Sequence, residues 1–262
     1  MTATIQKGYV DTRWGQLHYR RGGDRGPALV LLHQTANSSR MWMKLMPILG
    51  ERLRVFALDT PGFGMSDPPP AQPTFDDYCS VFVEAIDMLG LAETALLGFH
   101  TGAGFAVGIA ARSPSLVTQL VLMGAPVFDP DDDNSRRSRA ARAGWEPDAD
   151  GAYLERMWRI SSNPDLWVRH RELTDRMLAG PRAWWASAAV SDTDIRDLLP
   201  AIACPTLLLS GSKDFMLAKQ ESARALIPNA TLIVLPGETL IADERSEAVA
   251  ERILALVTSG ER

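Results

Sequence analysis

A short apolar segment that runs into a Gly-x-x-x-Gly turn constrains the fold of this chain more than any other feature. The segment, residues 95–98, leads into Gly98-Phe99-His100-Thr101-Gly102, and small and apolar residues follow over 101–112. Glycines on both sides of a central residue relieve the crowding of a tight bend. The pattern therefore predicts a strand, a sharp turn that presents the His100 side chain, and a helix.

Segments of two kinds alternate along the rest of the chain: apolar runs as long as buried strands, and segments with apolar residues at helical spacing. We expect an antiparallel hairpin at 8–21 and strands at 28–32, 54–58, 95–98, 116–123, 205–210 and 231–235. We expect helices at 41–49, 74–90, 101–112, 218–226 and 246–257. This alternation predicts an α/β fold with a mainly parallel, doubly wound sheet and an N-terminal antiparallel hairpin.

Residues 127–200 depart from this alternation. They carry runs of charge but no strand pattern, and four of the seven tryptophans lie within 153–199. We interpret them as a helical insertion whose charged runs form solvated helix faces. The predicted organisation is a core of residues 1–126 and 201–262, with the insertion at 127–200.

Composition limits the classes of partner. The net charge is −5, which leaves no basic surplus for nucleic acid or for an anionic membrane surface, so we expect a small-molecule substrate. Cys79 and Cys204 form neither a C-x-x-C pair nor part of a metal-ligand cluster, and no G-x-G-x-x-G loop is present. We therefore expect no cofactor and no metal. Without an apolar leader or a long apolar span, we expect a cytoplasmic protein; its oligomeric state stays open, a homodimer being one option.

Five segments, taken together and in order, resemble the landmarks of the α/β-hydrolase fold. They are residues 31–34 (Leu-Leu-His-Gln), 59–66 (Asp-Thr-Pro-Gly-Phe-Gly-Met-Ser), 98–102, 211–214 (Gly-Ser-Lys-Asp) and 235–237 (Leu-Pro-Gly). The resemblance implies that 98–102 is the turn called the nucleophile elbow and that 127–200 is the cap over the pocket. It also implies that Asp214 is the catalytic acid. The backbone N–H groups of Thr101 and of Gln34 or Thr35 would bind the oxyanion.

The sequence departs from the pattern of that family at three positions. His100 stands where a nucleophilic serine is expected, Thr239 stands where the catalytic histidine usually follows, and Gln34 replaces a glycine of the oxyanion loop. An imidazole at position 100 projects toward the place of the missing base. We therefore expect a His100–Asp214 dyad in which Asp214 fixes the tautomer of His100, and His100 acts as a general base. Covalent catalysis by the imidazole and an inert His100 remain the alternatives.

Four further residues are candidates for the pocket: His33, Thr239, Trp184 and Trp185. Adjacent tryptophans on a helix cannot both face a pocket, and His33 also fits a structural role between loops. Tryptophans and methionines in the insertion favour a largely apolar substrate. We expect the acids Glu238 and Asp243 of the last loop to be exposed to solvent.

Three functions remain open at this stage. General-base attack of water would hydrolyse an ester, lactone, amide or activated C–C bond. Proton abstraction by the same base would serve a lyase, an isomerase, a cyclase or a cofactor-free oxygenase. A ligand-binding member without catalysis is the third.

Overall fold

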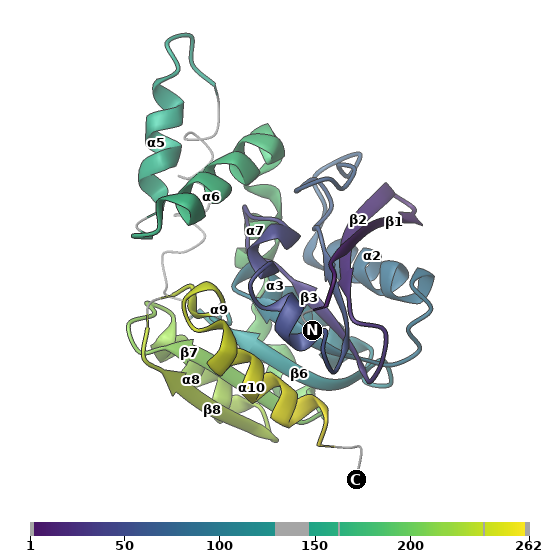
Figure 1. The fold of residues 1–262 in the computed structure, drawn as a ribbon. Helices are drawn as coiled ribbons and strands as arrows, with labels where there is room; N and C mark the ends of the chain where they lie inside the picture. The colour runs from purple at the N-terminus through teal and green to yellow at the C-terminus, as the bar shows by residue number, and fades with distance from the viewer. Residues whose placement is uncertain (1–2, 129–146, 162, 238, 260–262) are drawn as a thin grey trace.

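A computed structural model describes residues 3–128, 147–161, 163–237 and 239–259. The described residues form one sheet of eight strands in the order β1-β2-β4-β3-β5-β6-β7-β8 (Figure 1). The strands are β1 (Gln6–Thr12), β2 (Gly15–Gly22), β3 (Ala28–Leu32), β4 (Arg54–Leu58), β5 (Thr94–Phe99), β6 (Val117–Met123), β7 (Thr206–Gly211) and β8 (Ala230–Leu235). β2 pairs antiparallel with β1 and β4, and every other pairing is parallel. The predicted fold class, with its N-terminal hairpin, is confirmed.

Helices cover both faces of the sheet. The α-helices are α1 (Met46–Leu49), α2 (Phe75–Met88), α3 (Thr101–Arg112), α5 (Ala152–Ile160), α6 (Leu166–Ala179), α7 (Trp185–Ser191), α8 (Leu217–Leu226), α9 (Ile241–Glu244) and α10 (Ser246–Val257). Side chains of α2, α3 and α8 pack into one apolar cluster, and those of α1, α9 and α10 pack into a second. The central strands β3 and β5 are buried along their whole length, because helices enclose them on both sides.

The helix expected at 41–49 is the one element that forms differently. A 3₁₀ turn spans Ser39–Trp42, and the α-helix is the four-residue α1. Pro47 lies in the first turn of α1, where its missing N–H is tolerated, but its ring would collide with the preceding turn of a longer helix. The apolar spacing of this segment is kept by two short pieces in place of one helix.

The glycines that flank the turn after β5 allow β3, β5 and α3 to approach closely. A Cβ added to Gly98 would collide with the carbonyl oxygen of Gly102, and one added to Gly102 would collide with the carbonyl oxygen of Leu32. Both obstacles are backbone atoms, which cannot move aside without displacing a strand or a helix. This contact fixes where the N-terminus of α3 stands relative to the sheet.

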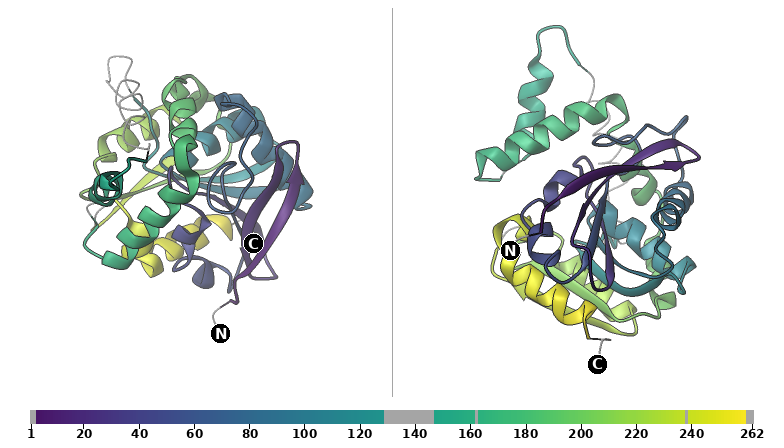
Figure 2. Two further views of the ribbon diagram at one scale, coloured as in Figure 1. Left: turned by 90° about the horizontal axis from the view of Figure 1, so that it is seen from above. Right: turned by 45° about the vertical axis from the view of Figure 1, so that its right-hand side comes forward.

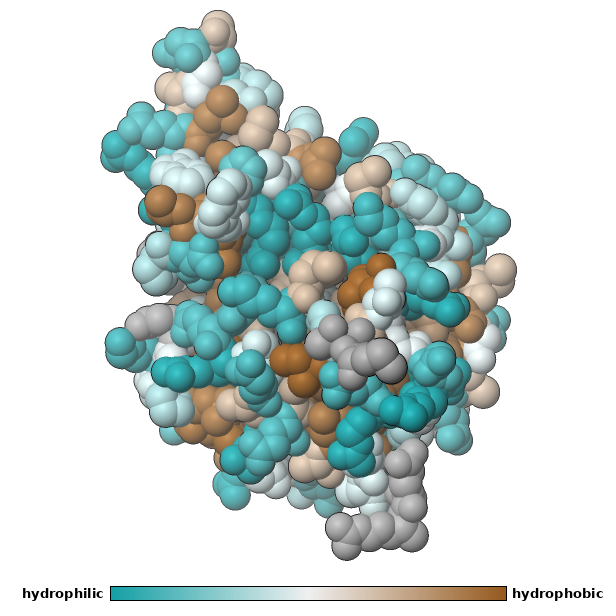
Figure 3. Space-filling view, in the orientation of Figure 1, coloured by the Kyte–Doolittle hydropathy of each residue, from teal (hydrophilic) through white to brown (hydrophobic). Residues whose placement is uncertain are grey.

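Helices α5, α6 and α7 lie between β6 and β7 in the chain, and the described part of 127–200 contains no strand. Figures 1 and 2 show α5 projecting from the molecule with α6 between it and the sheet, whereas α7 lies close to α3. On the face seen in Figure 3, hydrophobic and hydrophilic residues are interspersed over this projecting lobe. The expected division into a core and a cap stays a prediction, and residues 129–146 of the insertion lie outside the described residues.

No helix within the described ranges is long and apolar enough to cross a bilayer.

Candidate active site

His100 lies at the junction of β5 and α3, as the glycine pattern predicts. Among the described residues it is the one non-glycine residue with a positive φ, with φ 46° and ψ −110°. Its N–H donates to the Met123 carbonyl (2.8 Å), and its carbonyl accepts from the Gly104 N–H (3.0 Å). Such a backbone costs on the order of 1–3 kcal/mol and persists only where its surroundings hold it. The turn therefore presents the imidazole from a fixed position at the end of the sheet.

The imidazole of His100 packs among aromatic rings and backbone, and no carboxylate among the described residues is hydrogen-bonded to it. It stacks on Phe99 (ring centroids 4.4 Å apart, planes at 10°) and meets the edge of Phe215 at 5.4 Å. Its Nε2 lies against Gly124 and is buried without a hydrogen-bond partner among the described residues. Burial lowers the pKa of His100 to about 4. The ring is therefore neutral near pH 7.

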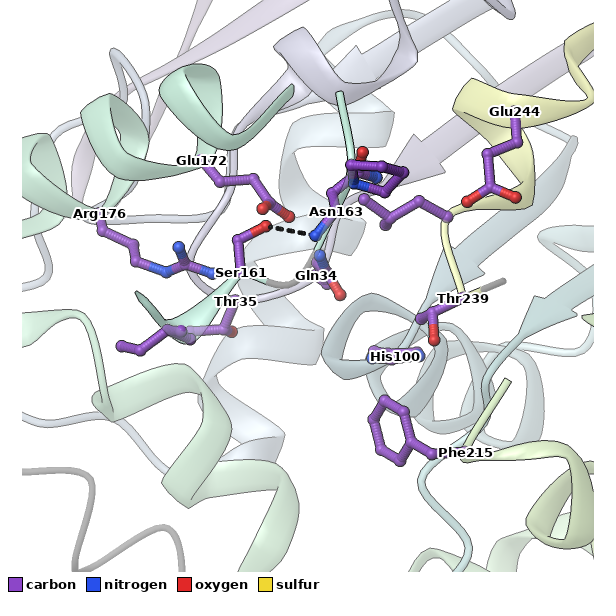
Figure 4. Close-up of a pocket in the computed structure, with 13 residues that line it drawn as sticks. Gln34, Thr35, His100, Ser161, Asn163, Glu172, Arg176, Phe215, Thr239 and Glu244 are labelled. Carbon is purple, nitrogen blue, oxygen red and sulfur yellow. Dashed lines mark hydrogen bonds between the residues drawn. The ribbon is translucent and has the colours of Figure 1, made fainter. Parts of the chain in front are cut away.

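Asp214 follows β7, and its carboxylate contacts Met216 and Thr239 and not the predicted partner, His100. Its Oδ1 accepts from the Met216 N–H (2.9 Å) and, over 3.5 Å, from the Thr239 hydroxyl. Burial raises the pKa of Asp214 against the effect of these two bonds. No hydrogen bond joins Asp214 to His100 within the described structure, so the direct contact expected for the dyad is not made. Figure 4 shows Thr239 beside His100. The hydroxyl of Thr239, and not the imidazole of His100, donates to the Asp214 carboxylate.

The loop after β3 contributes Gln34 and Thr35 to the same site. Both line the pocket next to His100. Thr101 is the first residue of α3, so its N–H has no partner inside the helix. The three residues expected to supply oxyanion N–H groups thus lie around the His100 turn.

His33, by contrast, holds two loops together and does not line the pocket. Its Nε2 accepts from the Thr60 N–H (2.9 Å), so its Nδ1 carries the proton and donates to the Gln34 carbonyl (2.8 Å). The side chain is 1% exposed, and burial lowers its pKa. His33 is therefore a neutral structural residue between loops, the role that its place in the sequence favoured over the pocket.

A pocket of about 560 Å³ opens at this end of the sheet. It is lined by Gln34, Thr35, His100, Ile160, Ser161, Asn163, Pro164, Glu172, Arg176, Phe215, Thr239, Leu240 and Glu244. Figure 4 shows the side chains of Glu172 and Arg176 extending from α6 on the side away from Phe215 and His100. Neither Trp184 nor Trp185 lines the pocket; their rings meet edge to face at 6.3 Å. The lining is more polar than the tryptophans of the insertion suggested.

Two ion pairs attach α6 to the body of the molecule. Arg171 donates through both terminal nitrogens to the carboxylate of Asp243 (3.2 and 2.6 Å). Arg40 donates to Asp175 (3.0 Å), which also accepts from the Ser38 hydroxyl (2.9 Å). Asp243 is 7% exposed, so the expectation of a solvent-exposed acid was wrong, because the partner on α6 was not foreseen. Glu238 lies outside the described residues.

Sequence reasoning missed Glu172 and Arg176. An acid and a base four residues apart on a helix are typical of an exposed face, and only burial in three dimensions reveals their place in the pocket. No group of three or more potential metal ligands occurs among the described residues.

Comparisons with known proteins identify the fold family of the chain. The family model described as alpha/beta hydrolase fold matches residues 27–239. Carboxylesterase YbfK of Bacillus subtilis is 27% identical over 266 residues, which span 96% of this chain and 88% of the esterase. N-formylmaleamate deformylase of Pseudomonas putida is 27% identical over 234 residues, which span 85% of this chain and 84% of the deformylase. The crystal structure of an enol-lactonase from Burkholderia xenovorans LB400 has the same fold, with a TM-score of 0.78 at 22% identity over 96% of this chain and 100% of that one.

Proposed function

Because this chain belongs to the alpha/beta hydrolase fold family, we propose that it hydrolyses a small molecule with His100 as general base in place of a serine nucleophile. The observation that carries the proposal is the neutral imidazole at the strained turn that borders the pocket, whose Nε2 has no hydrogen-bond partner among the described residues. The relatives named as carboxylesterase and deformylase, both aligned over most of this chain, support hydrolysis of an ester or an amide-like bond.

The proposed reaction uses water as the nucleophile. His100 takes a proton from water as the oxygen attacks the carbonyl carbon of the substrate. The oxyanion that forms faces the N–H groups of Thr101 and of Gln34 or Thr35. Collapse of the tetrahedral intermediate breaks the bond to the leaving group, which receives the proton from His100. General-base catalysis of this kind contributes typically about 10²–10⁴-fold to the rate.

Asp214 and Thr239 act beside the base as positioning residues in this proposal. When the Thr239 hydroxyl donates to Asp214, its oxygen keeps lone pairs that can accept a hydrogen bond from water or substrate. Residues 127–200 serve as the cap, since Ile160, Ser161, Asn163, Pro164, Glu172 and Arg176 line the pocket from this segment.

The test is turnover of a panel of phenyl esters, lactones and N-acyl amides in water labelled with heavy oxygen. We expect the label in the carboxyl product, and a fall in kcat of about 10²–10⁴-fold in His100→Ala. His100→Ser should not recover the activity, because no other histidine lines the pocket to activate the hydroxyl. Asp214→Asn should cost less than His100→Ala, since the two side chains are not hydrogen-bonded.

Three outcomes would contradict the proposal. Full activity of His100→Ala would exclude the imidazole as base. Solvent deuterium at a substrate carbon, without incorporation of oxygen, would assign the same base to a lyase, an isomerase or a cyclase. A ligand that is bound and recovered unchanged would indicate a binding protein.

A further inference from the structure

Two oppositely charged side chains of α6, Glu172 and Arg176, line the pocket, and each has a polar atom without a hydrogen-bond partner among the described residues. Glu172 and Arg176 lie one helical turn apart and are 3% and 8% exposed. Glu172 Oε2 and Arg176 Nη1 are buried, and neither atom has a hydrogen-bond partner in the described structure. The two side chains do not form an ion pair with each other, whereas the neighbouring cations Arg171 and Arg40 are paired with Asp243 and Asp175.

This arrangement is hard to explain as a stabilising feature. Glutamate and arginine are almost never buried unless they are paired, and a buried polar atom without a partner costs about 1–3 kcal/mol, more when it is charged. Apolar residues at both positions would pack α6 without that cost. Both side chains line the pocket, so the missing partners are to be sought in a bound molecule.

The two unpaired atoms define what such a molecule must offer. A guanidinium can only donate, and an ionised carboxylate can only accept. A ligand carboxylate would satisfy Arg176 but would repel Glu172, and a ligand ammonium would do the reverse. A neutral group with an acceptor and a donor side by side satisfies both.

We propose that Glu172 and Arg176 bind a carboxamide-like group of the substrate, such as a primary amide, a ureide or a lactam. Its carbonyl oxygen accepts from Arg176 Nη1, and its N–H donates to Glu172 Oε2. This inference names the substrate class for the site described above and rests on the proposed function. Figure 4 shows Glu172 and Arg176 on the side of the pocket away from His100, so a substrate held by these two side chains would extend its scissile bond toward His100.

The test uses three probes that share one ring and differ only in a planar head group: benzamide, benzoate and benzamidinium. Dissociation constants are measured by ligand-observed NMR titration with the wild-type chain and with Glu172→Gln, Arg176→Met and His100→Ala. Glu155→Gln is the matched control, because it removes an acid from the same insertion at an exposed site outside the pocket lining.

We expect the wild-type chain to bind benzamide at least about tenfold more tightly than either charged probe. Arg176→Met should weaken benzamide about tenfold or more. Glu172→Gln should strengthen benzoate about tenfold relative to the wild type, because the repelling carboxylate is gone. His100→Ala and Glu155→Gln should leave the order of the probes unchanged.

The proposal is overturned if benzoate binds the wild-type chain more tightly than benzamide, or if none of the probes binds. It is also overturned if Glu172→Gln leaves the preference as it was. If Arg176→Met does not fold, the isosteric variant Glu172→Gln alone tests the proposal. This test measures binding, so its failure can be distinguished from failure of the proposed function. A fully active His100→Ala would refute general-base hydrolysis but would leave the order of probe affinities unchanged.

Discussion

The ion pair between Arg171 and Asp243 gives a specific prediction about how α6 is held in place. Asp243→Asn removes the charge that faces Arg171 and leaves the guanidinium, 13% exposed, without its counter-ion. Breaking a buried pair by removing one partner costs about 3–5 kcal/mol. Since the arginine keeps some contact with water, we expect a loss of about 3 kcal/mol, or roughly 6–12 °C in the unfolding midpoint of a chain of this size.

The assay is urea unfolding followed by tryptophan fluorescence, with Glu155→Gln as control. The control removes one partner of an exposed pair on α5, which should contribute less than about 0.5 kcal/mol. A double variant, Arg171→Met with Asp243→Leu, should recover most of the loss, because two apolar side chains leave no buried charge. It also removes the Nε of Arg171, which is buried without a hydrogen-bond partner among the described residues. A loss in Asp243→Asn no larger than in the control would refute the view that this pair holds α6.

Two other predictions concern the sheet end and the loop beside it. Gly102→Ala should lower the free energy of unfolding by more than about 2 kcal/mol, because the new Cβ meets the Leu32 carbonyl. Gly90→Ala is the control: the position has a positive φ but open space around it, so the loss should be about 1 kcal/mol. Equal losses of the two variants in urea unfolding would contradict this prediction. Burial alone would raise the pKa of Asp59, but hydrogen bonds from His18, Met65 and Ser39 hold it below its usual value. Its contribution to stability is therefore present above about pH 4 and is lost as pH falls through the lowered pKa, so Asp59→Asn should flatten the acid side of a plot of stability against pH. An unchanged acid side would contradict that assignment.

The sequence predicted those parts of the fold in which local pattern and packing agree. The apolar runs at 28–32 and 95–98 are buried on both faces, as such runs in a parallel sheet must be. The glycines around His100 predicted the sharp turn because few other residues fit so close an approach of backbones. Pro47 was the one local signal overlooked, and it divides the expected helix at 41–49.

The site could be predicted only in part, because it depends on side chains that distant loops bring together. The sequence placed His100 at the turn but could not show that Thr239 contacts Asp214 in its place. Glu172 and Arg176 resemble an ordinary exposed pair until α6 is seen to cover the pocket. Opposite charges four residues apart carry no local sign of burial, so such a pair is recognised only after folding.

A measurement of the pKa of His100 shows directly whether its imidazole lacks a carboxylate partner. The chain has four histidines, so ring resonances of labelled histidine can be assigned by comparison with His100→Gln. An imidazole buried without a carboxylate partner should titrate at a pKa of about 4 and should be unaffected by Asp214→Asn. The pH dependence of kcat/KM should then be flat near pH 7 and fall only in acid. A pKa at or above the ordinary value of about 6.5 that falls in Asp214→Asn would contradict an imidazole without a carboxylate partner and would support the direct His100–Asp214 dyad.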